Sequence, residues 1–306
     1  MPTGARDSTE VFTQLMNEVA IQFGPGGRLI GILTIAGRHR DSNKPIVFVF
    51  LNAGLLHRPG PHRLHVRLAR DLAEYGFSSM RVDLGGLGDS LAEPDMELQQ
   101  SVAKDFDEIV QLVESELGPV EIVLFGLCSG ADNAIRLALE HPGVTGLVLL
   151  DPVCEKDEGF AARARSWRKK VLLRKALEPA RYVPWLKRKL SAWTSRRRAD
   201  EDSMDRLAVR ILPSAEQTND AFSAMHERNG YVLSIFTAYA TDYYNEEGQL
   251  GRVLDVSEYS SFCEELFWPH VLHTYPFEPD RRKLIEEIRG WAGRLEQRRL
   301  SAASES

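Results

Sequence analysis

A cysteine stands at the centre of a turn between two glycines, in Gly126-Leu127-Cys128-Ser129-Gly130. The turn follows an apolar run over residues 120–125 and precedes a segment with helical spacing over 131–140. A strand, a tight turn and a helix around one Ser or Cys is a setting in which enzymes present a nucleophile. The glycines have a steric role, because the strand and the helix must approach each other closely there. The N–H groups at the helix N-terminus favour a thiolate and an oxyanion. The pattern predicts nucleophilic catalysis by Cys128, and a packed structural cysteine is the alternative.

A thiol needs a base to become a nucleophile, and the base needs a carboxylate that orients it. In a site of this kind the order along the chain is nucleophile, acid, histidine. His273 lies directly before the last predicted helix, which favours it as the base over His270. Asp242 follows the apolar run over 231–237 and is the expected acid. Asp151, at the end of the preceding apolar run, is the alternative acid.

Backbone N–H groups can stabilise the oxyanion that forms when a nucleophile attacks a carbonyl group. The N–H of Ser129 directly follows the nucleophile, and the loop after the first long apolar strand contains Gly54 and Leu55. Gly54 lets that backbone turn, so the N–H of Leu55 is the expected second donor. Arg58 in the same loop is expected to bridge loops or to meet an anionic group of the substrate. Gly54 and Arg58 are therefore the candidate substrate-binding residues.

The elements that would position these residues alternate along the chain. Apolar runs predict strands at residues 19–23, 29–34, 46–52, 78–84, 120–125, 146–150 and 231–237, and within 264–273. Helical spacing of apolar residues predicts helices at 64–75, 102–117 and 131–140, and from residue 279 onward. This alternation predicts an α/β fold with a doubly wound, mostly parallel sheet.

Two further patterns carry no ligand prediction. Gly85-Gly86-Leu87-Gly88-Asp89-Ser90 follows a predicted strand but lacks the G-x-G-x-x-G spacing of a dinucleotide-binding loop, so it is interpreted as a tight turn. His57, His62 and His65 lie close together in sequence, but no second set of ligands with regular spacing accompanies them. No metal and no cofactor is therefore expected.

The alternation of strands and helices stops after residue 152. Residues 155–226 are charged and helical in pattern, which predicts a helical lid over the carboxyl edge of the sheet. The core is expected in two parts, residues 1–154 and 227–300, followed by a disordered tail over 301–306.

Charge and cysteine content limit the classes of function. The formal net charge is −6, which gives no indication of nucleic-acid binding. The three cysteines form no disulfide framework and fit a reducing compartment. No apolar run is long enough to span a membrane, and charged residues interrupt the N-terminal segment, unlike in a signal peptide. The protein is expected to be cytoplasmic and soluble.

Basic residues dominate the predicted lid between residues 160 and 198, where Glu178 is the only acidic residue. In an acidic chain such a local field is expected to attract an anionic partner, such as an acyl carrier protein or coenzyme A. Interleaved tryptophans make an anionic membrane surface a second hypothesis. A solvated helical face is the third.

The chain resembles the α/β-hydrolase superfamily through the loop at 52–54, the segment 81–90, the turn at Cys128, and Asp242 and His273. Residues 52–70 are most similar to small hydrolases found beside exosortase and polysaccharide gene clusters. The resemblance covers about residues 45–155 and 228–295. A cysteine in place of the usual serine is similar to dienelactone hydrolases, polyhydroxyalkanoate synthases, bile-acid-type N-acyltransferases and Dieckmann cyclases. This resemblance implies a Cys-His-Asp triad and an acyl-enzyme or carbanion step.

The cysteine suits thioester chemistry, because thiolates attack thioesters readily and exchange between two thioesters is nearly balanced in energy. The expected activity is acyl transfer, cyclisation or hydrolysis of an acyl thioester through an acyl group on Cys128, with His273 and Asp242. The alternatives are a carboxylesterase that acts on a small ester, and a hydrolase-fold binding protein without catalysis.

Overall fold

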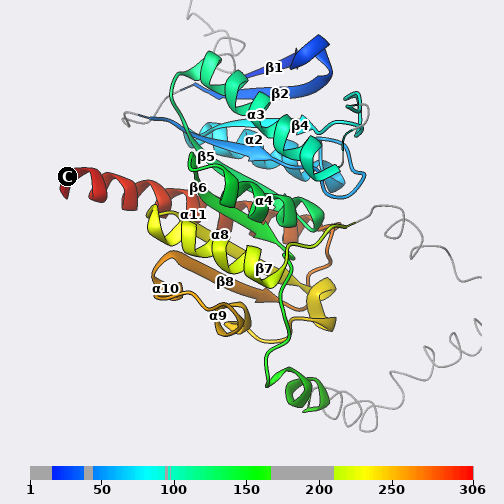
Figure 1. The fold of residues 1–306 in the computed structure, drawn as a ribbon, viewed down its shortest axis with the longest axis vertical. Helices are drawn as coiled ribbons and strands as arrows, with labels where there is room; N and C mark the ends of the chain where they lie inside the picture. Colours follow the sequence, from blue (N-terminus) through cyan, green and yellow to red (C-terminus); the bar gives the residue numbers. More distant parts are fainter. Residues whose placement is uncertain (1–15, 38–43, 94–95, 97, 167–209, 306) are drawn as a thin grey trace, which may run out of the picture.

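Within the part of the chain that the structure describes, eight strands form one sheet, and helices cover both of its faces (Figure 1). The computed structural model describes residues 16–37, 44–93, 96, 98–166 and 210–305. The strands are β1 (Met16–Phe23), β2 (Leu29–Ala36), β3 (Ile46–Phe50), β4 (Ser78–Asp83), β5 (Glu121–Leu127), β6 (Val144–Leu150), β7 (Tyr231–Thr237) and β8 (Cys263–Trp268). Their order across the sheet is β1-β2-β4-β3-β5-β6-β7-β8.

Most of the sheet is parallel. All neighbouring pairs from β4 through β3, β5, β6 and β7 to β8 are parallel. The strands β1 and β2 form an antiparallel hairpin, and β2 pairs antiparallel with β4. Every residue of β3 is buried, as expected for an apolar run with helices on both faces. The predicted α/β class and mostly parallel sheet are confirmed.

Helices lie in two layers (Figure 1). On one face are α2 (Leu64–Glu74) and α11 (Glu278–Glu305), and on the other are α3 (Leu98–Leu117), α4 (Ser129–Glu140) and α8 (Ala215–Glu227). Successive strand residues point to opposite faces, so the sheet divides the core into two clusters. The cluster under α2 and α11 includes Phe48, Leu68, Ile288 and Trp291. The cluster under α3, α4 and α8 includes Val49, Phe106, Ile135 and Phe222.

Short helices occupy the connections. They are η1 (Pro25–Gly27), η2 (Pro61–Arg63), η3 (Ala238–Asp242), α9 (Gln249–Val253) and α10 (Tyr259–Phe262). Because β3, β5, β6, β7 and β8 are parallel, their carboxyl ends lie at the same edge of the sheet. The loops that leave these ends therefore meet, and this edge is where open α/β sheets bind ligands.

Two predicted boundaries differ from the structure. Residues 215–226, which the sequence assigns to the lid, form most of α8, and Ala221, Phe222 and Met225 pack in the core beside α4. The C-terminal segment from Ser301 to Glu305 continues α11 instead of forming a disordered tail. No Gly or Pro follows Gly293, so nothing in the sequence stops the helix earlier.

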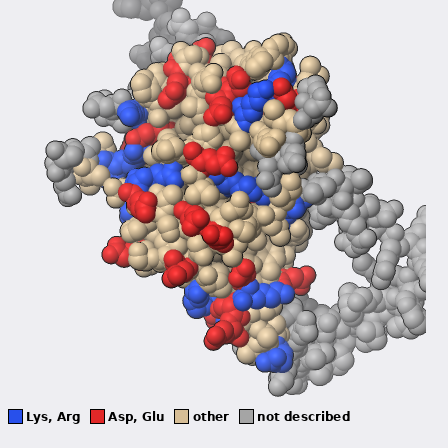
Figure 2. Space-filling model, viewed as in Figure 1, with Lys and Arg blue, Asp and Glu red and all other residues tan. Residues whose placement is uncertain are grey.

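Residues 167–209, which hold most of the predicted lid, lie outside the described residues, so the lid stays a prediction. The basic segment over 160–198 is described only from 160 to 166, where Arg163 pairs with Asp157 and Glu246. On the face that Figure 2 shows, acidic and basic side chains lie interspersed over the described surface. Among the described helices, none is both long and apolar enough to cross a membrane.

Candidate active site

Cys128 lies in a strained turn between β5 and α4. Its backbone has φ 56° and ψ −118°, a region that non-glycine residues seldom adopt. The neighbouring glycines make the turn sterically feasible. A Cβ on Gly126 would lie 2.2 Å from the backbone of Gly130, and a Cβ on Gly130 would lie 2.7 Å from the carbonyl oxygen of Asn52. The predicted tight approach of strand and helix around the thiol is therefore present.

His273 and Asp151 form a close pair beside this turn. His273 lies between β8 and α11, and its Nδ1 is 2.6 Å from Oδ2 of Asp151. Asp151 is fully buried at the end of β6. Thr237, at the end of the neighbouring β7, donates to Asp151 through its backbone N–H at 2.6 Å and its hydroxyl at 2.7 Å. These contacts fix the carboxylate, and the carboxylate in turn orients the imidazole.

The carboxylate that contacts His273 is that of Asp151, the alternative acid, and not that of Asp242, the expected one. Asp242 ends the short helix η3 with an exposed side chain, five residues beyond the end of β7. The carboxyl ends of β6 and β7 are neighbours in a parallel sheet, about 5 Å apart. A residue directly at the end of β6 therefore reaches the histidine. The alternative base, His270, is exposed, whereas His273 faces the buried acid.

The charge state of His273 follows from its partners. Burial by itself would lower the pKa of this imidazole, but the hydrogen bond to Asp151 and the interactions with Cys128 outweigh burial and raise the pKa to about 9. Tyr239 stacks on the ring with a centroid separation of 4.0 Å and restricts its orientation. The imidazolium form of His273 is thus favoured in the folded protein.

The loop that carries Gly54 and Leu55 is hydrogen-bonded to the turn at Cys128. The backbone N–H of Gly54 donates to the hydroxyl of Ser129 at 2.7 Å, which ties the loop after β3 to the start of α4. Gly54 has φ 55°, so this residue provides the turn that the sequence predicts. Within the described residues, no hydrogen bond occupies the backbone N–H of Leu55 or of Ser129. Both groups are available to a substrate oxygen.

Arg58 is predicted either to bind an anionic group of the substrate or to bridge two loops, and its contacts do not fit the first role. Its guanidinium pairs with the buried Asp83 and, at 2.6 Å, with Asp89. Its side chain is only 20% exposed, so its charge is used between loops. The other predicted role, that of a bridge between loops, agrees with these contacts.

Sequence reasoning missed three polar groups near Cys128. Arg210 pairs with the buried Asp132 in the first turn of α4, and a second nitrogen of Arg210 donates to the carbonyl of Asp151 at 3.3 Å. The hydroxyl of Tyr243 is 3.4 Å from the same carbonyl oxygen. Both Arg210 and Tyr243 interact electrostatically with Cys128. No motif marks these residues, because only the folded chain brings them to the cysteine.

The histidines at positions 57, 62 and 65 differ in their surroundings. His57 and His62 are exposed, whereas His65 is buried against Phe50 of β3 and Phe125 of β5. In the described ranges, no group of three or more His, Cys, Asp or Glu is arranged to hold a metal ion.

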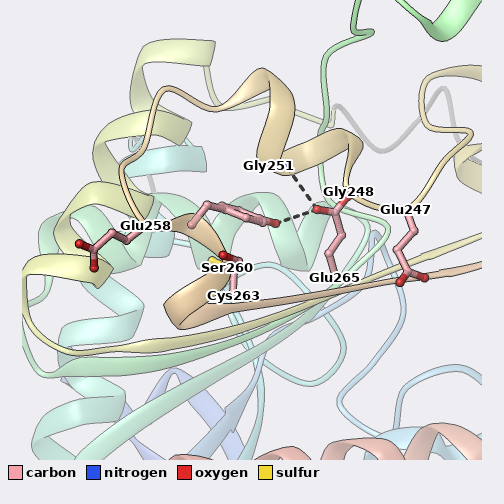
Figure 3. Close-up of a pocket in the computed structure, with 8 residues that line it drawn as sticks. Glu247, Gly248, Gly251, Glu258, Ser260, Cys263 and Glu265 are labelled. Atoms are coloured by element: carbon pink, nitrogen blue, oxygen red, sulfur yellow. Dashed lines mark hydrogen bonds between the residues drawn. The ribbon is translucent and has the colours of Figure 1, made fainter.

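A shallow hollow of about 590 Å³ lies elsewhere, over β8 and the short helices α9 and α10 (Figure 3). Its central carboxylate, Glu265, accepts hydrogen bonds from the hydroxyls of Tyr244 and Tyr259 and from the backbone N–H groups of Leu250 and Gly251. Figure 3 shows this side chain turned toward Gly251. Both oxygens of Glu265 are therefore engaged within the fold, and none of the residues that line the hollow belongs to the group at Cys128.

Comparison with known families gives one match. A model of the family described as "Serine aminopeptidase, S33" matches residues 55–227, which contain the turn at Cys128 and Asp151. The family name refers to a serine, and this chain has a cysteine in the turn between Gly126 and Gly130. No curated protein matches the chain.

Several solved structures share the fold at low sequence identity. Est1E from Butyrivibrio proteoclasticus has a TM-score of 0.52 at 14% identity and covers 91% of this chain and 99% of its own. A thermostable carboxyl esterase from Bacillus coagulans gives 0.52 at 14% and covers 92% and 99%. A structure described as a putative lipase from Acinetobacter baumannii AYE gives 0.51 at 11% and covers 96% and 99%. At these identities the likeness establishes the α/β-hydrolase fold alone.

Proposed function

The chain belongs to this serine aminopeptidase S33 family of α/β hydrolases, and on that premise we propose that it hydrolyses carboxylic esters through an acyl group on Cys128. The observation that carries the proposal is the contact of His273 with Asp151 beside the strained turn of Cys128. A nucleophile, a base and a buried orienting acid in this relation are what acyl transfer to an enzyme requires.

Acylation begins when the Cys128 sulfur attacks the ester carbonyl carbon. In the proposed resting state the thiol proton is already on Nε2 of His273, whose Nδ1–H is held by Asp151. The carbonyl oxygen becomes an oxyanion, which the N–H groups of Leu55 and Ser129 stabilise. His273 then returns the proton to the alkoxide oxygen as the C–O bond breaks, so that the alcohol leaves and the acyl group stays on sulfur.

Deacylation uses the same histidine as a base. Interactions with Cys128 contribute to the raised pKa of His273. Once the sulfur carries an acyl group, its negative charge is gone, so the pKa of His273 falls and the neutral imidazole can accept a proton from water. The hydroxide equivalent attacks the thioester carbonyl, the C–S bond breaks, and the carboxylic acid leaves. The sulfur departs as a thiolate beside the protonated His273, which restores the resting state.

The surroundings of the site suit an apolar acyl group. Leu55, which carries one proposed oxyanion donor, and its neighbour Leu56 have exposed side chains. Tyr239 stacks on His273, Leu272 directly precedes it, and both are also exposed. Exposed patches of large apolar side chains often mark a binding site. The proposed substrate is therefore an ester with a largely apolar acyl part.

A second candidate function is acyl transfer from a thioester, and the cysteine itself favours it. Attack of a thiolate on a thioester exchanges one C–S bond for another at little cost in free energy, and the acyl-cysteine then reacts with an amine, a thiol or a carbanion. An acyl carrier protein or coenzyme A stays a proposal here, since the basic segment that would bind it lies mostly at residues 167–209, outside the described residues.

The test is turnover of p-nitrophenyl acetate and butyrate, combined with intact-protein mass spectrometry. We expect an added acyl mass that peptide mapping assigns to Cys128, and loss of turnover in Cys128→Ala. Cys154→Ala is the matched control, because burial raises the pKa of the Cys154 thiol to about 12 and keeps it unreactive. Turnover that persists in Cys128→Ala would refute the proposal.

The same assay separates the two candidate functions. With butyryl-N-acetylcysteamine as donor and a primary amine as acceptor, a hydrolase gives mainly butyrate, and a transferase gives mainly the amide. Chromatographic quantification of the two products decides between them.

A further inference from the structure

We propose that the glycine-rich turn after β4 is a clamp on the carboxylate of Asp83 that positions the oxyanion loop, and that Asp83, Arg58 and Asn52 are positioning residues for catalysis. The oxyanion loop here means residues 53–58. The proposal rests on the proposed function, because it concerns how the N–H of Leu55 is held for the transition state.

Asp83 is fully buried at the end of β4, and its two oxygens accept four hydrogen bonds. Oδ1 accepts from the backbone N–H of Arg58 at 2.5 Å and from Nδ2 of Asn52 at 3.2 Å. Oδ2 accepts from the guanidinium of Arg58 and from the backbone N–H of Asp89 at 3.2 Å. A buried carboxylate that receives this many donors fixes the geometry of each donor.

The glycine-rich turn encloses that carboxylate. Gly88 has φ 52°, and a Cβ there would lie 2.2 Å from Oδ2 of Asp83, so only glycine permits the approach. The hydroxyl of Ser90 donates to the backbone carbonyl of Asp83 at 2.5 Å. Asp89 supplies a second acceptor for Arg58. The turn therefore holds both Asp83 and the guanidinium that Asp83 binds.

Asn52 also restrains the backbone of the oxyanion loop. Its Oδ1 accepts from the backbone N–H of Leu84 at 2.9 Å, and its Nδ2 donates to the carbonyl of Leu56 at 2.8 Å. This side chain is 2% exposed, so it is fixed by burial as well as by hydrogen bonds.

Leu55 lies between three anchored points. Ser129 holds the N–H of Gly54, Asn52 holds the carbonyl of Leu56, and Asp83 holds the N–H of Arg58. The loop otherwise has exposed side chains at Leu55 and Leu56 and little packing of its own. An oxyanion donor works only if it is already in place when charge develops on the oxygen. The anchors supply that preorganisation from outside the site.

The experiment compares Arg58→Gln and Asp83→Asn with Arg28→Gln as a matched control. Arg28 is a buried arginine that pairs with Asp105 and Glu93 on the other side of the same turn, without touching the oxyanion loop. Three quantities are measured: kcat and KM for p-nitrophenyl butyrate, the rate of Cys128 alkylation by iodoacetamide, and amide hydrogen exchange in peptides that cover residues 53–58.

We expect kcat to fall about ten- to hundredfold in Arg58→Gln, less than the 10²–10³-fold that loss of a whole oxyanion donor costs. KM should change less than about threefold, and alkylation should keep its wild-type rate because it forms no oxyanion. Exchange over residues 53–58 should become faster. Arg58→Lys should recover part of kcat, because one ammonium group can still bind Asp83. Arg28→Gln should lower the melting temperature without changing kcat.

The proposal is overturned if Arg58→Gln and Asp83→Asn keep wild-type kcat, or if alkylation falls in parallel with kcat, which would mean that the whole site has deformed. If Asp83→Asn does not fold, the two Arg58 variants still decide the question. Cys128→Ala is assayed beside them: its residual turnover tests the proposed function, independently of how the Arg58 variants behave.

Discussion

At the scale of single residues, the assignment of the acid has the sharpest consequence. Asp151 contacts His273 and is fully buried, whereas Asp242 is exposed on η3. We expect Asp151→Asn to lower kcat by about 10⁴-fold, because an amide stabilises the wrong tautomer and no longer favours the imidazolium.

The matched variant Asp242→Asn should keep kcat within about twofold, as a surface substitution normally does. The measurement is kcat for p-nitrophenyl butyrate in both variants at the same concentration of folded enzyme. A larger loss in Asp242→Asn than in Asp151→Asn would reverse the assignment.

The pKa of His273 gives a second prediction at this scale. The pKa is raised above the usual 6.5 to about 9, against burial, by Asp151 and Cys128. A group whose pKa is higher in the folded state stabilises the fold fully below its unfolded pKa, and this contribution is lost as the pH rises through the folded pKa. The free energy of unfolding should therefore decline between about pH 6.5 and 9.

NMR titration of the imidazole resonances checks the value directly. We expect an apparent pKa near 9 for His273 in the wild type and a clearly lower one in Asp151→Asn, where the strongest favourable partner is removed. His270, which is exposed, serves as the internal comparison. A titration of His273 near 6.5 in the wild type would contradict the prediction.

At the scale of elements, the packing of α4 against the end of β3 depends on Gly130. A Cβ at this position would meet the backbone carbonyl of Asn52 at 2.7 Å, and a backbone atom cannot move aside as a flexible side chain can. We expect Gly130→Ala to cost about 1–3 kcal/mol of unfolding free energy, the usual range for overpacking. It should also lower kcat, because the helix carries Ser129.

Gly143→Ala is the control for that experiment, since no atom lies within 4 Å of a Cβ built on Gly143. It should change the unfolding free energy by less than about 0.5 kcal/mol. Urea denaturation measures both variants. Equal stability of Gly130→Ala and Gly143→Ala would show that α4 can shift away from Asn52 without cost.

At the scale of the whole molecule, one buried histidine couples folding to acid pH. Burial against Phe50 and Phe125 lowers the pKa of His65 from 6.5 to about 4. Between these two values the unfolded chain binds a proton that the folded chain does not, so stability falls as the pH falls from about 6.5 to 4. In this range the ionisation of His65 changes the free energy of unfolding by about 1.4 kcal/mol per pH unit.

We expect His65→Leu to remove this part of the slope, whereas His270→Gln should leave it unchanged because His270 is exposed. Unfolding free energies measured by urea at several pH values between 4 and 7 give the difference. If the His65→Leu curve stays parallel to the wild type, His65 does not control acid stability.

The sequence by itself determined the parts of this protein that depend on local pattern. The alternation of apolar runs and helical spacing predicts the parallel sheet. The glycines around Cys128 predict the tight turn, because only glycine lets two backbone segments approach so closely. Gly54 likewise predicts a turn of the backbone in the loop that carries Leu55. Each of these features depends on residues that are close together in the sequence.

Tertiary structure decided which side chains meet. Asp151 and Asp242 both follow strands that end at the same edge, and sequence spacing does not tell which of them faces His273; the lateral neighbours β6 and β7 and the donors of Thr237 decide it. In the same way, α8 joins the core because α4 presents an apolar face to it. Arg58 turns to Asp83 because the glycine-rich turn, 25 residues away, holds a buried carboxylate there. Contacts between distant segments form where burial leaves a charge that must be paired, and that is a property of the folded chain.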